Sequence, residues 1–159
     1  MPRISFSLNS KSIDSALKQL TAYQRKVQSA GTNLTSVLVE RGVEIAKNEA
    51  MYMNAYDSGE LVDGIVGEAN GEQGSVQATA PHSAYVEFGT GVRGAQNPHP
   101  EPGLAGWKYD INAHGEEGWW YWKNGEWHWT AGMQSRPYMY NTAKQLKQLV
   151  EPLAKEVLK

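Results

Sequence analysis

The chain has 159 residues, a length typical of one compact domain and too short for two independent enzymatic domains. Its 15 lysines and arginines stand against 17 aspartates and glutamates, and the resulting net charge of -2 argues against a general affinity for nucleic acid or anionic lipid. Cysteine is absent, which excludes disulfides and thiolate metal sites. Apolar runs of signal-peptide or membrane-spanning length are missing too, so we expect one soluble domain, residues 1–159, made in the cytosol.

The first segment alternates apolar and polar side chains. Its apolar positions are Ile4, Phe6 and Leu8, and its polar positions are Arg3, Ser5 and Ser7. This period of two predicts a short, half-buried strand.

From Lys11 the apolar residues follow the period of a helix. They recur at spacings of three, four and multiples of seven, at Ile13, Leu17, Leu20, Val27, Leu34, Leu38 and Ile45. A narrow stripe kept for about forty residues predicts a helix longer than one domain needs, part of which would pack on another subunit. Gly31 and Gly42 each cost about 1 kcal/mol relative to alanine inside a helix, so two ordinary amphipathic helices are the alternative.

The central region predicts a small sheet followed by a loop. A turn at residues 57–59 leads into two candidate strands, 64–69 and 75–80, which would pair as an antiparallel hairpin. The segment Ser83–Phe88 is short enough to be a strand or one helical turn. Glycines and three prolines in residues 89–106 predict a long loop, and loops of that length are usually functional or mobile.

The segment 119–129, WWYWKNGEWHW, holds five of the six tryptophans. Asn124-Gly125 is the preferred pair for a type I′ turn and predicts a two-residue hairpin. The resulting cross-strand pairs would be Trp120 with Trp129, Tyr121 with His128, Trp122 with Trp127, and Lys123 with Glu126. Because side chains alternate between faces, four indoles would share one face. That face would either stack on sugar rings or unpaired bases, or cover the core or a subunit interface, which is the use we favour.

The last segment predicts an amphipathic helix from Tyr138 to the C-terminus, with Pro137 in its first turn and a kink or break at Pro152. The expected fold class is therefore α+β: a long N-terminal helix and a C-terminal helix packed on a small antiparallel sheet, with a Trp-rich β-hairpin.

Motifs of catalysis and metal binding are absent from the sequence. It contains no His-Glu-x-x-His pair, nucleophile elbow, phosphate loop or EF-hand pattern. The four histidines lie in or beside predicted turns and strands, where ligation is uncommon. Glu87, between apolar neighbours, either faces outward or forms an ion pair with Arg93 or with an arginine of another subunit. We predict no catalytic residue, no cofactor and no metal site.

Two segments together resemble a known family. They are AYVEFGTG at residues 84–91 and SRPYMYNTA at residues 135–143, with DSGELVDGI at 57–65 and NPHPEP at 97–102 as weaker companions. The set is similar to the tail-component, or neck, proteins of long-tailed bacteriophages of the siphovirus type. That family commonly has Phe where Tyr138 stands here, and only part of it carries the Trp-rich insert.

The resemblance implies a structural virion protein of the head-tail connector region, active in tail completion, with no enzymatic activity, cofactor or metal. It would assemble in the host cytoplasm as a homo-oligomeric ring, hexameric in the family, and lie in the neck or head-proximal tail. Its partners would be the tail tube or tail terminator and the head-closure or connector proteins, and neither a membrane nor sequence-specific nucleic acid.

The expected scaffold and subunit contacts come from the two motifs and from the loop 89–106, which we expect to reach a neighbouring subunit or the next ring. They are Tyr85, Glu87, Phe88, Thr90, Arg93, His99, Arg136 and Tyr138. The alternative function is a carbohydrate-binding accessory protein whose platform is the ladder of Trp120, Trp122, Trp127 and Trp129.

Overall fold

The computed structural model describes residues 4, 5, 7–55, 59–101, 103, 106–110, 114 and 117–158. The elements in chain order are α1 (Ser10–Tyr52), α2 (Glu60–Asp63), β1 (Ile65–Asn70), β2 (Gln73–Ala78), α3 (Ser83–Phe88), α4 (Gly91–Gln96), β3 (Trp119–Lys123), β4 (Glu126–Thr130) and α5 (Tyr138–Val157). The predicted α+β class is confirmed, with both helices and two small antiparallel two-stranded sheets.

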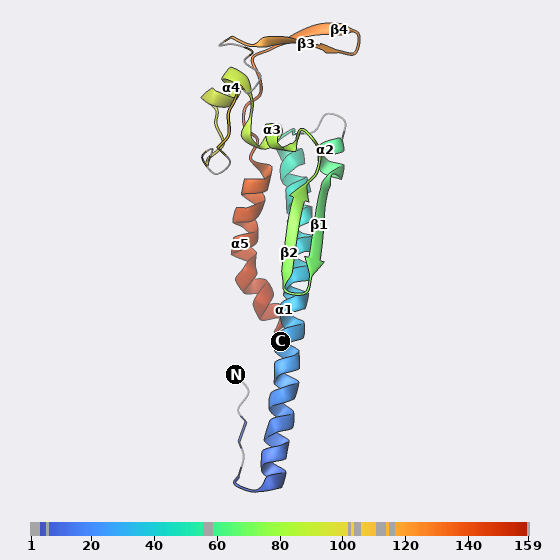
Figure 1. Ribbon diagram of the computed structural model, residues 1–159, viewed down its shortest axis with the longest axis vertical. Coiled ribbons are helices and arrows are strands. Elements are labelled where there is room, and N and C mark those ends of the chain that lie inside the picture. The colour runs from blue at the N-terminus through green and yellow to red at the C-terminus, as the bar shows by residue number, and fades with distance from the viewer. Residues whose placement is uncertain are drawn as a thin grey trace.

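Helix α1 is the long axis of the molecule, and the other elements gather along its C-terminal half (Figure 1). The hairpin β1–β2 and helix α5 pack against this half, while α3, α4 and the hairpin β3–β4 lie beyond its end. The N-terminal half of α1 projects away from them. The buried core lies where these elements meet and includes Ala46 and Ala50 of α1, Leu61, Ile65 and Tyr138.

Helix α1 is continuous through both glycines, so the two-helix alternative is excluded. Gly42 is buried, and a Cβ added to it would lie 2.7 Å from a methyl carbon of Val76 and 3.0 Å from one of Leu146. The absence of a side chain therefore lets β2 and α5 both approach α1. This close packing offsets the low helix propensity of glycine.

The hairpin β1–β2 has the predicted pairing direction but a tighter turn. Asn70 pairs with Gln73, which leaves a two-residue turn instead of the longer connection expected from the sequence. One face of the hairpin lies on α1, and a Cβ added to Gly74 would lie 2.5 Å from the side chain of Val39. The sheet approaches the helix closely because glycine stands at the point of contact.

Two expectations from the sequence need correction, the N-terminal strand and the loop 89–106. The N-terminal strand is not formed: Ile4, Ser5 and Ser7 lie in no strand, and Leu8 is 95% exposed. A strand is stable only in a sheet, and the described chain offers this segment no paired neighbour. The loop 89–106 contains helix α4. Of the two alternatives for Ser83–Phe88, the helical one is confirmed. Of the turn predicted at 57–59, only Gly59 lies within the described residues. It has a φ of 89° and is the N-cap of α2.

Helix α5 begins at Tyr138, as expected from the sequence. Pro137 is its N-cap and does not belong to its first turn. It continues through Pro152 without a break, and its end bends toward α1 (Figure 1). Val157 and Leu158 line a hollow there together with Ala30 and Leu34 of α1.

Candidate functional site

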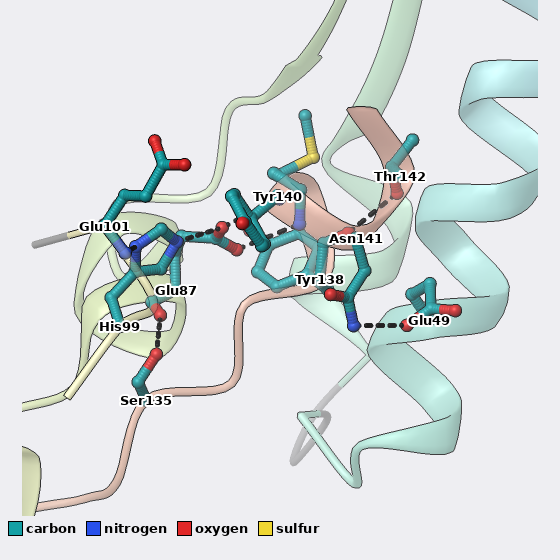
Figure 2. A network of polar contacts seen from close by, with 10 residues as sticks. Glu49, Glu87, His99, Glu101, Ser135, Tyr138, Tyr140, Asn141 and Thr142 are labelled. Atoms are coloured by element: carbon teal, nitrogen blue, oxygen red, sulfur yellow. Dashed lines mark hydrogen bonds and ion pairs between the residues drawn. The ribbon is translucent and has the colours of Figure 1, made fainter. Parts of the chain in front are cut away.

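The carboxylate of Glu87 caps the N-terminus of α5 from a different helix. The first N–H groups of a helix lack partners within it, and the residue before the first turn often supplies one. Here that residue is Pro137, which makes no side-chain cap bond. Glu87 of α3 replaces it, because Oε2 accepts from the N–H of Met139 and Oε1 from that of Tyr140, both at 2.9 Å (Figure 2). The negative charge also lies at the positive end of the helix dipole.

His99 lies on the other side of the same carboxylate, and only 3% of its surface and 7% of that of Glu87 is exposed. Its Nε2 is 3.2 Å from Oε1 of Glu87, and its Nδ1 accepts the backbone N–H of Glu101 at 3.0 Å. Because Nδ1 is an acceptor, the proton is assigned to Nε2, which donates it to the carboxylate. Two of the alternatives for Glu87 are therefore wrong. The side chain is buried and does not face outward, and its partner within the chain is His99 and not Arg93, which is exposed on α4.

The two sequence motifs that carried the resemblance contact each other in the fold. In addition to the hydrogen bonds that the Glu87 carboxylate accepts, the backbone N–H of Arg136 donates to the carbonyl of Val86 at 2.9 Å. The second motif also reaches α1, because the amide of Asn141 donates to the carboxylate of Glu49 at 3.0 Å (Figure 2). The network joins α3, α5 and α1, so these residues have an internal structural role.

Tyr138, the first residue of α5, is fully buried beside this network. Its hydroxyl has no hydrogen-bond partner in the described part of the chain. Burial, and secondarily the negative charge of Glu87, raises the pKa of this phenol well above its usual range. The side chain is therefore held as a neutral core group.

The other expected contact residues divide between the interior and the surface. Phe88 stacks on Trp107 with ring centroids 5.2 Å apart, and the indole N–H of Trp107 donates to the carbonyl of Gly89 at 2.9 Å. Tyr85 packs edge-on against the same indole and keeps partial exposure. Thr90 pairs with Met133 in an isolated bridge. Of the eight expected residues, only Tyr85 and Arg93 are exposed; Thr90, Phe88 and Arg136 are half-buried, and Glu87, His99 and Tyr138 are buried.

The Trp-rich hairpin forms in the predicted register, with Trp120 opposite Trp129 and Trp122 opposite Trp127. Asn124 and Gly125 both have positive φ, as a type I′ turn requires. The paired indoles meet edge to face, with centroids 5.6 and 5.4 Å apart. All four are 49% to 63% exposed, because the hairpin projects beyond the end of the molecule (Figure 1). They therefore do not cover the core of their own chain, and the expected uses as an interface or a ligand platform stay predictions.

A second apolar surface runs along the projecting half of α1, and we call it the α1 stripe. Its large side chains are 40% to 56% exposed and comprise Ile13, Leu17, Leu20, Tyr23 and Val27. The sequence predicted that part of this helix would extend beyond what the domain covers, and the arrangement in Figure 1 agrees with that.

Sequence reasoning missed one anchor, Glu49 of α1. Its carboxylate accepts from Asn141 and, at 2.7 Å, from the side chain of Gln145. The sequence does contain one indication of such an anchor. Asn141 and Gln145 are four residues apart on the expected C-terminal helix, so their amide side chains share one face and can bind one partner.

No protein-family model, curated protein or solved structure matches this chain. Within the described ranges, no three side chains of the metal-binding types converge on a common point. None of the helices described combines the length and apolar character needed to cross a membrane.

Proposed function

We propose that the protein is a structural subunit of the neck or head-proximal tail of a long-tailed bacteriophage. It assembles as a homo-oligomeric ring that helps join tail to head, and it acts by association and not by catalysis. The resemblance of its two motifs to the neck family is one line of support. The observation that carries the proposal is the exposed α1 stripe.

The stripe favours association because of how helices are stabilised. A helical segment of about twenty residues without tertiary packing is marginal in water, and most helical stability in proteins comes from burial of an apolar face. In the projecting half of α1, the large apolar residues of one side remain open to solvent in the single chain. Burial contributes about 25 cal/mol per Å² of apolar surface, so a partner along this stripe would stabilise both the helix and the complex.

Ring formation fits such a surface. In a closed ring each subunit offers two different patches to its neighbours, and the contact closes by rotation. The N-terminal half of α1 and the hairpin β3–β4 lie at opposite ends of the molecule in Figure 1. The exposed side chains of the α1 stripe and of the Trp face therefore form two separate surfaces. Glu87, His99 and Tyr138 then hold the subunit in shape and make no contact across the ring.

The test is the mass of the purified chain by light scattering across a concentration series, with negative-stain images of the largest species. Closed rings that bind isolated phage tails or head connectors are the expected result. A chain that stays monomeric at high concentration and binds neither particle would refute the proposal.

Carbohydrate binding by an accessory protein is the second candidate, and the exposure of four indoles on one face favours it. Indole rings stack on sugar rings, and an open platform is what such binding needs. Tryptophan fluorescence of the monomer that changes on titration with soluble glycans would support this candidate. Indoles that become shielded from acrylamide on assembly, with no glycan response, would assign the same face to an interface.

A further inference from the structure

One edge of strand β2 is unpaired. The sheet has two strands, β1 and β2. Hydrogen-bonded and non-hydrogen-bonded residue pairs alternate along it, beginning with the hydrogen-bonded pair Asn70–Gln73 at the turn. The main-chain N–H and C=O groups of Gly74 and Val76 therefore point away from β1. No other described segment donates to or accepts from these four groups. An edge of this kind is a template for an added strand.

A groove of about 380 Å³ runs beside this edge, between β2 and α5 and over α1. Apolar and small side chains from all three elements line it: Leu38 and Val39 of α1, Val76 of β2, and Met139, Ala143 and Leu146 of α5. A strand added to an edge lies about 4.8 Å from its neighbour and alternates its side chains between the two faces of the sheet. The strand that fits here has apolar residues at every second position, facing the groove, and polar residues between them.

One segment with this pattern lies in no strand at any of its described positions. Residues 4–8, ISFSL, place Ile4, Phe6 and Leu8 on one side and two serines on the other. Its residues Ile4, Ser5 and Ser7 lie in no strand, and Leu8 is almost fully exposed. Ile4 is half-buried, but no strand pairs with the segment among the described residues. The pattern of a half-buried strand is therefore present without the paired neighbour that would stabilise it.

The segment cannot reach the groove of its own chain. Helix α1 begins at Ser10, and the groove begins at Thr35. At about 1.5 Å per helical residue these positions are about 38 Å apart, whereas the residues before the helix span only about 20 Å when fully extended from residue 4. In Figure 1 the described residues of this segment lie beside the first turns of α1, far from β2. An occupant with this sequence must come from a second copy.

We propose that residues 4–8 of one copy add as a third strand to the free edge of β2 in a neighbouring copy, with Ile4, Phe6 and Leu8 in the groove. Main-chain hydrogen bonds to Gly74 and Val76 supply affinity, and the alternating side chains set the register. Glu72 lines the turn end of the groove and Arg3 precedes the segment, so opposite charges favour the direction that brings them together. The contact is heterologous and deepens the self-association of the proposed function, on which it rests.

The test uses the lack of cysteine in the chain. Ser5 would lie on the outer face of the added strand and Ser75 is on the outer face of β2, so a Ser5→Cys variant and a Ser75→Cys variant are mixed and mildly oxidised. A disulfide needs Cα atoms within about 7 Å. We expect a cross-linked dimer that contains one copy of each variant.

Two controls make the result specific. Glu68→Cys in place of Ser75→Cys moves the thiol to β1, one strand further from the edge, and should lower the yield of the mixed dimer at least tenfold. Ser5→Cys combined with Ile4→Ser and Leu8→Ser removes two of the groove-facing side chains, both outside the core, and should lower the yield to the same extent. The unfolding temperature of each variant shows that the fold is retained.

The outcomes separate this inference from the proposed function. Oligomers that form without the mixed cross-link, or that keep it after the two serine substitutions, overturn the strand addition and leave the ring proposal standing. A chain that remains monomeric and forms no cross-link at any concentration overturns both.

Discussion

At the scale of single residues, Glu87 has the most consequential position because one carboxylate serves three donors. The variant Glu87→Gln keeps the shape but replaces one acceptor oxygen with an amide that faces a donor, either a helix N–H or His99. We expect the free energy of unfolding to fall by about 1 to 3 kcal/mol, the cost of leaving buried donors without acceptors. Urea denaturation at neutral pH measures it.

Glu101→Gln is the matched control for this variant. Its side chain is exposed, and only its backbone N–H contacts His99. The same chemical change there should shift the unfolding free energy by less than about 0.5 kcal/mol, as surface substitutions usually do. Equal losses in the two variants would mean that net charge, and not the cap on α5, is the cause.

Tyr138 gives a prediction with a pH dependence. Its pKa in the folded protein is raised above the ordinary value of about 10, so the folded state holds the phenolic proton more tightly than the unfolded chain does. The stability that this contributes is complete below about pH 10 and is lost as the pH rises toward the folded pKa. Tyr138→Phe should therefore weaken the alkaline loss of stability.

At neutral pH the same variant should be neutral or more stable by up to about 1 kcal/mol, because the hydroxyl is buried without a partner among the described residues. Urea denaturation at neutral pH and again above pH 10 measures both effects. Tyr52→Phe, at an exposed side chain, is the control. A clear loss of stability in Tyr138→Phe at pH 7 would show that the hydroxyl has a partner in solution.

At the scale of elements, the two glycines of α1 predict opposite effects for the same substitution. Alanine gains about 1 kcal/mol of helix propensity over glycine at either site. At Gly31 the new methyl meets only the flexible carboxylate of Glu72, at 3.0 Å, so Gly31→Ala should stabilise by up to about 1 kcal/mol. At Gly42 it meets the packed methyl groups of Val76 and Leu146, and overpacking outweighs the gain, so Gly42→Ala should destabilise by about 1 to 2 kcal/mol. Thermal unfolding of both variants checks the pair, and a stabilised Gly42→Ala would contradict the close packing.

How far the sequence predicted each element depends on where its stabilising contacts lie. The register of β3–β4 was predictable because Asn124-Gly125 fixes the turn and the strands follow from it. The continuity of α1 was not, because it depends on the distant neighbours of Gly42. The same holds for the cap on α5: the sequence marked Glu87 as unusual, but its contacts with residues more than fifty positions away come only from the fold. The N-terminal strand failed for the converse reason, since its pattern is local but the described part of the chain contains no strand that pairs with it.

At the scale of the whole molecule, the separation between a packed half and a projecting half of α1 is the main feature. Stability is not uniform across a structure, and helical segments with few buried contacts open most easily. We therefore expect hydrogen exchange in dilute solution to be fast in residues 10–27 and slow around Ala46 and Ala50. If the protection of residues 10–27 from hydrogen exchange increases with protein concentration, this helical segment is stabilised by assembly.

The substitution Leu20→Lys tests the α1 stripe directly. It places a charge in the middle of the exposed apolar surface, where a partner would have to bury it without compensation. We expect self-association to weaken at least tenfold, as measured by sedimentation or light scattering, with little change in the unfolding free energy of the monomer because the side chain is about half exposed. Ala22→Lys adds the same charge about 200° further around the helix, on the exposed opposite side, and should leave association unchanged. If both lysines weaken association equally, general charge repulsion is the cause; if neither does, the stripe is no interface and the subunits meet through another surface.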